Sequence, residues 1–312
     1  MGLDDRRFAD LSRLVRLIDA RATLRRTWPL KGGISSRMTA IEVAFEDGRM
    51  RRMVVRQPSD ETIRRHPRAA ADEFKLLQIL QSTAIPAPAP YHLDESRESL
   101  ATPCLVIEYI DGAPESSPTD VSDFIAQFAA RLAEIHRIDG VDVRLAFLPK
   151  HSPCFVEQRG RAVTDAALNV KRIREVLEAT WPADSRNRLA LLHGDYWPGN
   201  VVWKDGQLRG VIDWEEARIG DPIADLATSR LDILWAFGID AMIEFTDCYQ
   251  GSAPIDLTDL PYWDLDAALR PAFNIAQWAS AYPDLGRSDI TETTMRAGHA
   301  LFVSQAFEAL SI

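Results

Sequence analysis

The 312-residue chain has only three cysteines, Cys104, Cys154 and Cys248, and they lie far apart in the sequence. Thiols so sparse give neither a disulfide framework nor the paired spacing of a zinc site. Long apolar runs are also missing, since none approaches the roughly 20 residues that a membrane span needs. The first residues mix arginines with aspartates and contain no signal-peptide core. We therefore expect a cytoplasmic protein with no membrane partner.

Basic residues are scarce in the second part of the chain. Residues 1–112 carry 18 Lys and Arg against 16 Asp and Glu, whereas residues 113–312 carry 18 against 30. From residue 240 onward, 11 acids face 3 bases. Nucleic acid is a poor partner for such a surface. A cationic substrate would suit it, although solubility alone explains the excess about as well.

Hydrophobic periodicity divides the chain into a strand-rich first part and a helical second part. The elements expected before residue 111 are a helix over 8–27 ended by Trp28-Pro29, strands over 39–45 and 50–56, a helix over 68–82 and a strand over 105–110. From residue 120 onward helical patterns dominate, interrupted by a hairpin at 201–213. The sequence thus predicts an α+β protein. Its small antiparallel-sheet N-terminal lobe spans residues 1–110, and its larger, mainly helical C-terminal lobe spans residues 111–312.

Three oxygen-bearing side chains lie close together in the sequence HGDYWPGNVVWKDGQLRGVID, residues 193–213. Asn200 follows Asp195 by five positions, and Asp213 follows Asn200 by thirteen. Asp205-Gly206 between two apolar runs is a strong hairpin signal, so we expect Asn200 and Asp213 at the same open end, beside Asp195. Oxygen ligands of this kind suit Mg²⁺, and the pattern is typical of metal-assisted phosphoryl transfer. The alternative, in which these residues only form turns and cap strands, is competitive for each one singly but weak for all three together.

The N-terminal part offers groups that could bind a nucleotide. Gly32, Gly33, Ser35 and Ser36 precede a predicted strand, and glycine lets backbone N–H groups approach phosphate oxygens. Taken alone, these glycines form an ordinary turn in most proteins.

Arg56 closes the next predicted strand and could hold phosphates if a carboxylate fixed its direction. Glu73 shares a helix face with leucines, where a carboxylate is costly unless it is paired. We expect Glu73 to pair with Arg56; the alternative is a charge at the edge of the helix face that reaches water.

Other polar residues are given structural roles. The six histidines show no HExxH spacing, so a backbone-bracing role is expected for His193 and a satisfied helix position for His136. Asp221 and Asp225 resemble a turn and a helix start, with aspartate at or near the cap.

Together these residues resemble the aminoglycoside phosphotransferase/choline kinase family, which is related in fold to the protein kinases. The resemblance extends from about Gly32 to about Ala227 and is most specific in HGDYWPGN and VIDWEEARIGDPIADLA. It implies a two-lobed protein-kinase-like fold with Asp195 as the catalytic base and with Asn200 and Asp213 as the Mg²⁺ ligands.

The resemblance also implies how a nucleotide would be bound. Gly32 to Ser36 would be the nucleotide-positioning loop, and the adenine would contact the backbone C=O of Glu108 and N–H of Ile110. One departure is Arg56, where related kinases usually carry lysine; arginine is no geometric equivalent of lysine.

Three functions are compatible with these features. The first is a small-molecule O-phosphotransferase that moves the γ-phosphoryl group of Mg-ATP, or GTP, to a hydroxyl of a metabolite or an aminoglycoside-like acceptor. The second is a nucleotide-binding pseudokinase acting as a sensor or scaffold, and the third is a metal-dependent hydrolase, which leaves Arg56 and Glu73 without a task. The acceptor is not readable from the sequence, and the candidate contacts are only polar or aromatic residues that follow the metal segment: Glu216, Asp232, Trp235, Asn274 and Trp278.

Overall fold

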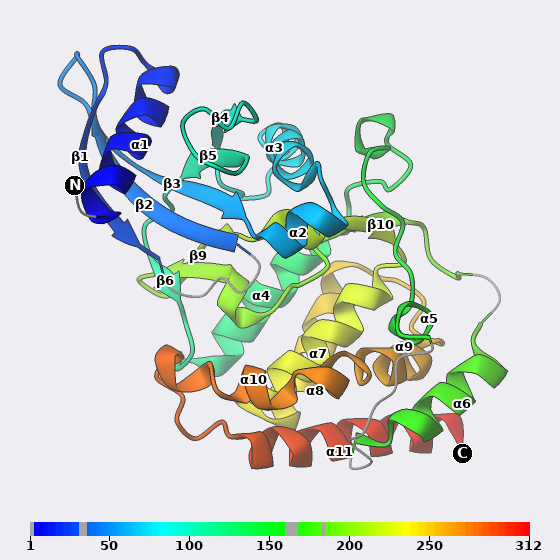
Figure 1. Ribbon diagram of the computed structural model, residues 1–312. Helices are drawn as coiled ribbons and strands as arrows, with labels where there is room; N and C mark the ends of the chain where they lie inside the picture. The colour runs from blue at the N-terminus through cyan, green and yellow to red at the C-terminus, as the bar shows by residue number, and fades with distance from the viewer. Residues whose placement is uncertain (1–2, 31–35, 160–167, 183–184) are drawn as a thin grey trace. The chain divides into compact units, whose positions relative to one another are not determined.

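The computed structural model describes the chain except for residues 1–2, 31–35, 160–167 and 183–184. It divides into two compact units (Figure 1). Unit 1 comprises residues 1–111 together with the short segment 210–215, and unit 2 comprises residues 112–209 and 216–312. The segment 210–215, which the sequence places far along the second lobe, is therefore part of unit 1.

Unit 1 is built on a five-stranded sheet in the order β1-β2-β3-β5-β4, in which every neighbouring pair is antiparallel. Its strands are β1 Thr23–Pro29, β2 Ser36–Ala44, β3 Met50–Pro58, β4 Pro90–Asp94 and β5 Cys104–Glu108. Three helices accompany the sheet: α1 Leu3–Ile18, α2 Asp60–Arg65 and α3 Ala69–Leu80.

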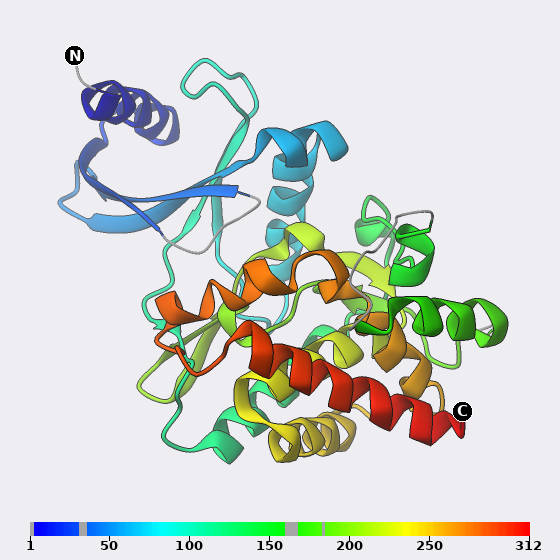
Figure 2. The ribbon, with the colours of Figure 1, turned by 60° about the horizontal axis from the view of Figure 1, so that its bottom comes forward.

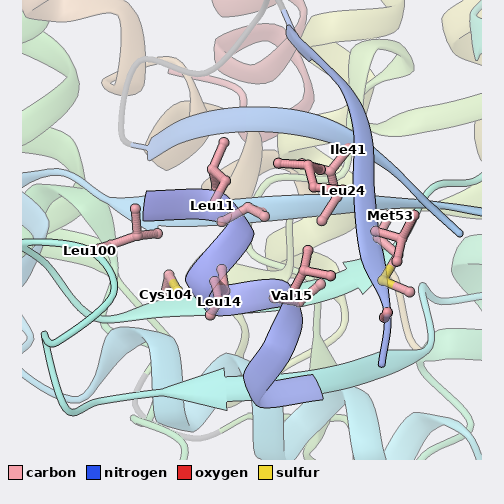
Figure 3. Close-up of a cluster of buried hydrophobic side chains, with 12 residues drawn as sticks. Leu11, Leu14, Val15, Leu24, Ile41, Met53, Leu100 and Cys104 are labelled. Carbon is pink, nitrogen blue, oxygen red and sulfur yellow. The ribbon is translucent and has the colours of Figure 1, made fainter. Parts of the chain in front are cut away.

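One face of this sheet packs against α1, and the other carries Arg56. Leu11, Leu14 and Val15 of α1 pack on buried side chains of the strands, among them Ile41 and Met53 (Figure 3). Successive strand residues point to opposite faces, so Met53 and Val55 of β3 lie toward α1 while Val54 and Arg56 lie on the other face. The core under α1 therefore fixes the register that turns Arg56 away from it.

The expected helix over 8–27 is wrong in its second part. Helix α1 ends at Ile18, and residues 23–29 form β1, which pairs with β2 with one shift of register between Leu24 and Arg26. Helical spacing of apolar residues stops at Ile18, and after it β-branched and aromatic residues, Thr23, Thr27 and Trp28, suit a strand. Strand β4 was not expected either, because the prolines before it read as a helix stop followed by loop.

Unit 2 is mainly helical. Its helices are α4 Val121–Ile135, α5 Cys154–Glu157, α6 Val170–Thr180, α7 Ile223–Phe237, α8 Ile239–Ser252, α9 Leu260–Ala267, α10 Ile275–Ala279 and α11 Glu292–Leu310. Helix α7 is buried along all of its length except Phe237, as expected of a helix covered on every side. It packs against α8, α9 and α11, and Figure 2 shows α11 in red.

Short strands complete the chain: β6 Ala113–Pro114, β7 Ala190–Leu192, β8 Val201–Lys204, β9 Gln207–Val211 and β10 Arg218–Gly220. The expected hairpin is confirmed, because β8 and β9 are neighbours and Asp205 and Gly206 both have positive φ, 52° and 70°. Among the helices that the structure describes, none combines the length and the apolar character that a membrane crossing requires. The expected α+β organisation, with an antiparallel sheet first and mostly helices after it, is confirmed.

Candidate functional site

Arg56 of β3 lies at the centre of a cluster of carboxylates in unit 1. Its side chain is only 2% exposed, and its Nε lies 3.0 Å from Glu73 Oε2 of α3. Its Nη2 lies 2.6 Å from Asp213 Oδ1 and 2.6 Å from Glu215 Oε2. The predicted pairing of Arg56 with Glu73 is present, and Asp213 joins the same cluster, which the sequence had not predicted. The structure adds Glu215, which the sequence analysis missed although it stands two positions after Asp213.

This cluster carries more negative than positive charge. One guanidinium faces three carboxylates, a formal balance of −2. Against the effect of burial, the three carboxylates raise the pKa of Arg56, so the guanidinium stays charged. Burial raises the pKa of Glu73 to about 7, although Arg56 opposes this and the neighbouring Asp213 and Glu215 add to it. A cation brought to this group would therefore meet attraction even after Arg56 is counted.

Other residues of unit 1 were predicted to contact a nucleotide, and the structure describes only some of them. Gly32, Gly33 and Ser35 lie outside the described residues. Ser36 begins β2 and donates its hydroxyl hydrogen bond to Glu215 Oε2 at 3.1 Å. Glu108 ends β5, and its carboxylate accepts a hydrogen bond from the backbone N–H of Ala89 at 3.1 Å.

Ile110 follows β5 and contacts the segment 210–215. A Cβ built on Gly210 would lie 2.3 Å from Ile110 Cδ1, so a larger residue there would require the Ile110 side chain to shift. The backbone of this segment is tied to unit 1 by a hydrogen bond from Val211 N to Pro86 O at 2.8 Å. These contacts explain why Asp213 and Glu215 belong to the unit that carries Arg56.

Asp195 and Asn200 lie together in unit 2, in the turn between β7 and β8. Asn200 Nδ2 donates to both Asp195 Oδ2, at 3.0 Å, and Asp195 backbone O, at 2.9 Å. A carboxylate can only accept, so the amide nitrogen of Asn200 must face Asp195, and its oxygen Oδ1 points elsewhere. The predicted base and one predicted metal ligand are thus direct partners.

A third side chain completes the unit 2 group. Arg270, in the 3-10 turn Arg270–Phe273, donates from Nη2 to Asp195 Oδ1 at 2.9 Å. Its Nη1 lies 3.4 Å from Asp232 Oδ2 of α7, and its guanidinium lies over the Trp278 ring at 5.6 Å from the centroid. Both oxygens of Asp195 are therefore held by donors, while its side chain stays 35% exposed. Arg270 was missed by the sequence analysis, where its one distinguishing mark was being among three bases after residue 240.

Charge and burial differ within this group. Burial raises the pKa of Asp232 to about 7, with Arg270 opposing the rise. Against burial, Asp232 and Asp195 raise the pKa of Arg270, which therefore remains a cation. The group thus has a permanent cation next to Asp195, the more exposed of its two carboxylates.

The backbone around Asp195 is fixed by α7. Asp225 is buried and accepts hydrogen bonds from the backbone N–H groups of His193, at 2.7 Å, and Gly194, at 3.0 Å. Its carboxylate also contacts His136 Nε2 at 3.3 Å, and although burial acts in the other direction, this contact lowers the pKa of Asp225. The expected cap residue Asp225 is thus a brace for the loop that carries Asp195.

His193 and Gly194 fit this braced loop. Nδ1 of His193 accepts from the backbone N–H of Asp195 at 3.3 Å, as the bracing role predicted. Gly194 has φ +84°, and a Cβ there would lie 2.1 Å from the backbone O of Glu216. The loop therefore needs glycine at this position for two independent reasons.

The five candidate acceptor contacts fall into three groups. Asp232 and Trp278 lie against Arg270, as above. Trp235 packs edge-on to Trp278, with ring centroids 6.2 Å apart, and donates from Nε1 to Met295 O. Glu216 is exposed and paired with Arg218, and Asn274 is an exposed residue at the start of α10.

Within the described part of the chain, no group of three or more His, Cys, Asp or Glu is arranged to hold a metal ion by itself. Mg²⁺ does not require such a group, because it keeps several waters and needs one or two carboxylates beside phosphate oxygens. Asn200 presents an amide oxygen, and Asp213 lies in a cluster with an excess of negative charge. Each of the two residues, taken within its own unit, is thus of the chemical kind that Mg²⁺ binds.

The model of the phosphotransferase enzyme family matches residues 27–243 of this chain. Acyl-CoA dehydrogenase family member 10 of Mus musculus is 25% identical over 197 residues, covering 58% of this chain but only 18% of that protein. The chain thus spans less than a fifth of that relative's length. A homoserine kinase of Methylocella silvestris is 24% identical over 229 residues, covering 67% of this chain and 70% of the kinase.

Solved structures show the same architecture. The structure of the GDP and kanamycin complex of APH(2")-IIia superposes with a TM-score of 0.64 at 16% identity, covering 96% of this chain and 97% of that one. At this level of identity the similarity concerns the fold. It confirms the expected two-lobed, protein-kinase-like arrangement of elements.

Proposed function

We propose, since the chain belongs to the phosphotransferase enzyme family, that it transfers the γ-phosphoryl group of Mg-ATP or Mg-GTP to a hydroxyl of a small acceptor. Nucleotide as donor is suggested by the GDP bound in the similar structure. Acceptors to consider are hydroxylated metabolites, cationic ones included, and aminoglycoside-like compounds. A metabolic kinase and a resistance enzyme would use the same chemistry.

One observation carries the proposal: a partly exposed carboxylate, Asp195, whose two oxygens are fixed by Asn200 and Arg270 on a loop braced from α7. Phosphoryl transfer passes through a loose transition state, so catalysis needs orientation of the acceptor oxygen more than a strong base. In this proposal Asp195 accepts the hydrogen bond of the acceptor hydroxyl, aims its oxygen at the γ-phosphorus and takes up its proton. A carboxylate fixed on both oxygens has little conformational freedom left to lose in doing so.

The unit 1 cluster is assigned to the nucleotide. Arg56 would contact phosphate oxygens, and Glu73 would hold Arg56 in place from α3. Ser36 and the loop Gly32, Gly33 and Ser35 would surround the phosphates, and the backbone of Glu108 and Ile110 would bind the adenine. Asn200 and Asp213 would hold Mg²⁺, which neutralises charge that develops on the phosphates.

A nucleotide-binding pseudokinase is the second candidate, and the environment of Arg56 favours it. Arg56 stands where related kinases usually have lysine, and it is already in ion pairs with three carboxylates. A phosphate must share or replace these partners. A sensor that binds nucleotide slowly or weakly, without transfer, would tolerate this competition for Arg56 better than an enzyme would.

The deciding experiment measures ADP and GDP release from Mg-ATP and Mg-GTP across a panel of hydroxylated metabolites and antibiotics. The panel contains acceptor pairs that differ only in bearing an amino group, so that a preference for cations is visible. Asp195→Ala and Asp213→Asn proteins are compared with Asp205→Asn, a control in a surface turn where asparagine also tolerates positive φ.

We expect acceptor-stimulated release that falls by about 10³-fold or more in Asp195→Ala and Asp213→Asn, and that stays unchanged in the control. An Asp195→Ala protein as active as the wild type would overturn the kinase assignment. Mg-dependent nucleotide binding without stimulated release by any acceptor would favour the pseudokinase.

A further inference from the structure

Arg270 is a partly buried cation that the phosphotransfer chemistry assigned above does not use. It is fixed by tertiary contacts, since it contacts Asp195 from 75 positions away and Asp232 from 38 positions away. Its side chain is 23% exposed, whereas that of Asp232 is 11% exposed. The order of the three groups runs from buried Asp232 through Arg270 to the more exposed Asp195.

We propose that Arg270 is a positioning residue for Asp195: its guanidinium fixes one carboxylate oxygen, and Asp232 fixes the guanidinium. This inference rests on the proposed role of Asp195. It goes beyond that role because it assigns a task to two residues outside the loop that carries the base.

The geometry supports a division of labour on the two oxygens of Asp195. Asn200 donates to Oδ2 at 3.0 Å, and Arg270 donates to Oδ1 at 2.9 Å. Removing either donor frees rotation about the bond that carries the carboxylate, while the loop backbone stays braced by Asp225. Because a misplacement of about 1 Å can cost about 100-fold in rate, rotation of this carboxylate is enough to slow the transfer.

Arg270 is itself held in more than one direction. Asp232 pairs with Nη1 from α7, and the Trp278 ring lies under the guanidinium. A long arginine side chain loses conformational entropy when it is fixed, and these contacts supply that restraint before any substrate binds. Arg270 therefore approaches Asp195 from one fixed direction.

The chain offers a matched control in Arg230 and Asp264. This pair is likewise an arginine and an aspartate in unit 2, more buried than Arg270, with Nε–Oδ1 and Nη2–Oδ2 distances of 3.1 Å. Both pairs join α7 to the segment of α9 and the turn that follows it. None of the hydrogen bonds described for the Arg230–Asp264 pair reaches Asp195. Breaking this pair therefore measures the effect of losing a buried ion pair without disturbing a partner of Asp195.

The first arm of the test measures coupling without using activity. Urea midpoints of the full-length protein are compared for Arg270→Gln and Asp264→Asn, each in the wild-type and in the Asp195→Ala background. We expect Arg270→Gln to shift the midpoint at most half as much in the Asp195→Ala background, and Asp264→Asn to shift it equally in both. Equal shifts of Arg270→Gln in the two backgrounds would overturn the proposal.

The second arm measures kcat with the acceptor found in the panel, and nucleotide affinity by titration with a fluorescent ADP analogue and Mg²⁺. We expect kcat to fall about 10- to 100-fold in Arg270→Gln and less in Asp232→Asn and Arg270→Lys, with nucleotide Kd within about twofold of wild type. Asp264→Asn should keep kcat within about twofold. A wild-type kcat in Arg270→Gln would reject the positioning role.

The two arms separate failure of this inference from failure of the proposed function. If no acceptor stimulates the wild-type protein while the coupling is present, the kinase assignment fails and Arg270 is still a partner that fixes Asp195. If turnover is found and depends on Asp195 but the coupling is absent, the kinase assignment holds and the role of Arg270 is rejected.

Discussion

At the scale of single residues, the geometry of the carboxylate cluster explains why position 56 carries arginine rather than lysine. Nε of Arg56 forms an ion pair with Glu73, and Nη2 forms ion pairs with Asp213 and Glu215. Two nitrogens of the planar guanidinium therefore contact carboxylates in two directions. A lysine would have to contact all three carboxylates from one ammonium nitrogen, whereas arginine distributes its donors over a planar fork. The departure from the usual lysine therefore matches the third carboxylate, Glu215, beside the two that the sequence had singled out.

Substitutions of Arg56 should separate the contribution of its charge to stability from that of its fork geometry. We expect Arg56→Lys to lower the free energy of unfolding by about 2 kcal/mol, the magnitude of a lost charge-assisted hydrogen bond. Arg56→Met should cost about 3–5 kcal/mol, because it leaves buried carboxylates without a cation. Urea unfolding followed by tryptophan fluorescence measures both. Equal stability of Arg56→Lys and wild type would show that the fork geometry contributes nothing.

The sequence identified individual residues better than their partners. Glu73 was expected to pair with Arg56, because a carboxylate on an apolar helix face needs a cation, and the pair is present. Glu215 and Arg270 were missed, since their partners lie 159 and 75 positions away and no local periodicity reports such contacts. The convergence of Asn200 and Asp213 at one end of the hairpin stays a prediction.

At the scale of elements, the strongest local signals were confirmed and the weakest boundary was wrong. The turn Asp205-Gly206 and strands β2 and β3 follow from residue chemistry within a few positions. Strand β1 was assigned to a helix because its stability comes from pairing with β2, whose paired residues are 10 to 21 positions away. An edge strand with Arg25 and Arg26 in it has little alternation to reveal it.

The loop that carries Asp195 should depend on glycine at position 194. Gly194 and Gly206 both have positive φ, 84° and 70°, but a Cβ meets the backbone O of Glu216 at 2.1 Å in the first and nothing within 4 Å in the second. Gly206→Ala should therefore cost only the backbone term, about 1 kcal/mol. Gly194→Ala should cost clearly more and displace Asp195.

Thermal unfolding and phosphotransfer rate measured on both glycine variants check this expectation. Gly206→Ala should keep the wild-type rate, whereas Gly194→Ala should lose most of it. If both variants lose the same stability and keep activity, the loop has room to move and the close approach to Glu216 does not constrain it.

At the scale of the whole molecule, the excess of acids in the second part says little about the acceptor. Several of these acids lie in ion pairs within unit 2, which neutralise them locally but leave the net excess of acids unchanged. The pairs are Asp259 with Arg186, Asp264 with Arg230, Asp289 with Arg287 and Glu292 with Arg296. Asp266 accepts from the backbone N–H groups of Cys154 and Phe155. The local cation Arg270 beside Asp195 bears on acceptor charge more than the net charge does.

The chain crosses between the two units at residues 111/112, 209/210 and 215/216, so unit 1 is not a continuous piece of sequence. A fragment of residues 1–111 lacks Asp213 and Glu215, two of the three partners of Arg56. It also lacks the hydrogen bond from Val211 N to Pro86 O and the buried Trp214. We expect this fragment to show no cooperative thermal transition by circular dichroism, although it contains the entire five-stranded sheet.

A second fragment restores what the first one lacks. Joining residues 208–217 to residue 111 through a flexible glycine-serine linker returns both carboxylates, and we expect a cooperative transition to reappear. The matched control carries Asp213→Ala and Glu215→Ala in the joined segment, which keeps Val211 and Trp214 but leaves Arg56 with Glu73 alone. Its midpoint should fall below that of the joined fragment, because a buried guanidinium that has lost partners is costly. A fragment of residues 1–111 that melts like the joined one would show that the sheet and α1 suffice without segment 210–215.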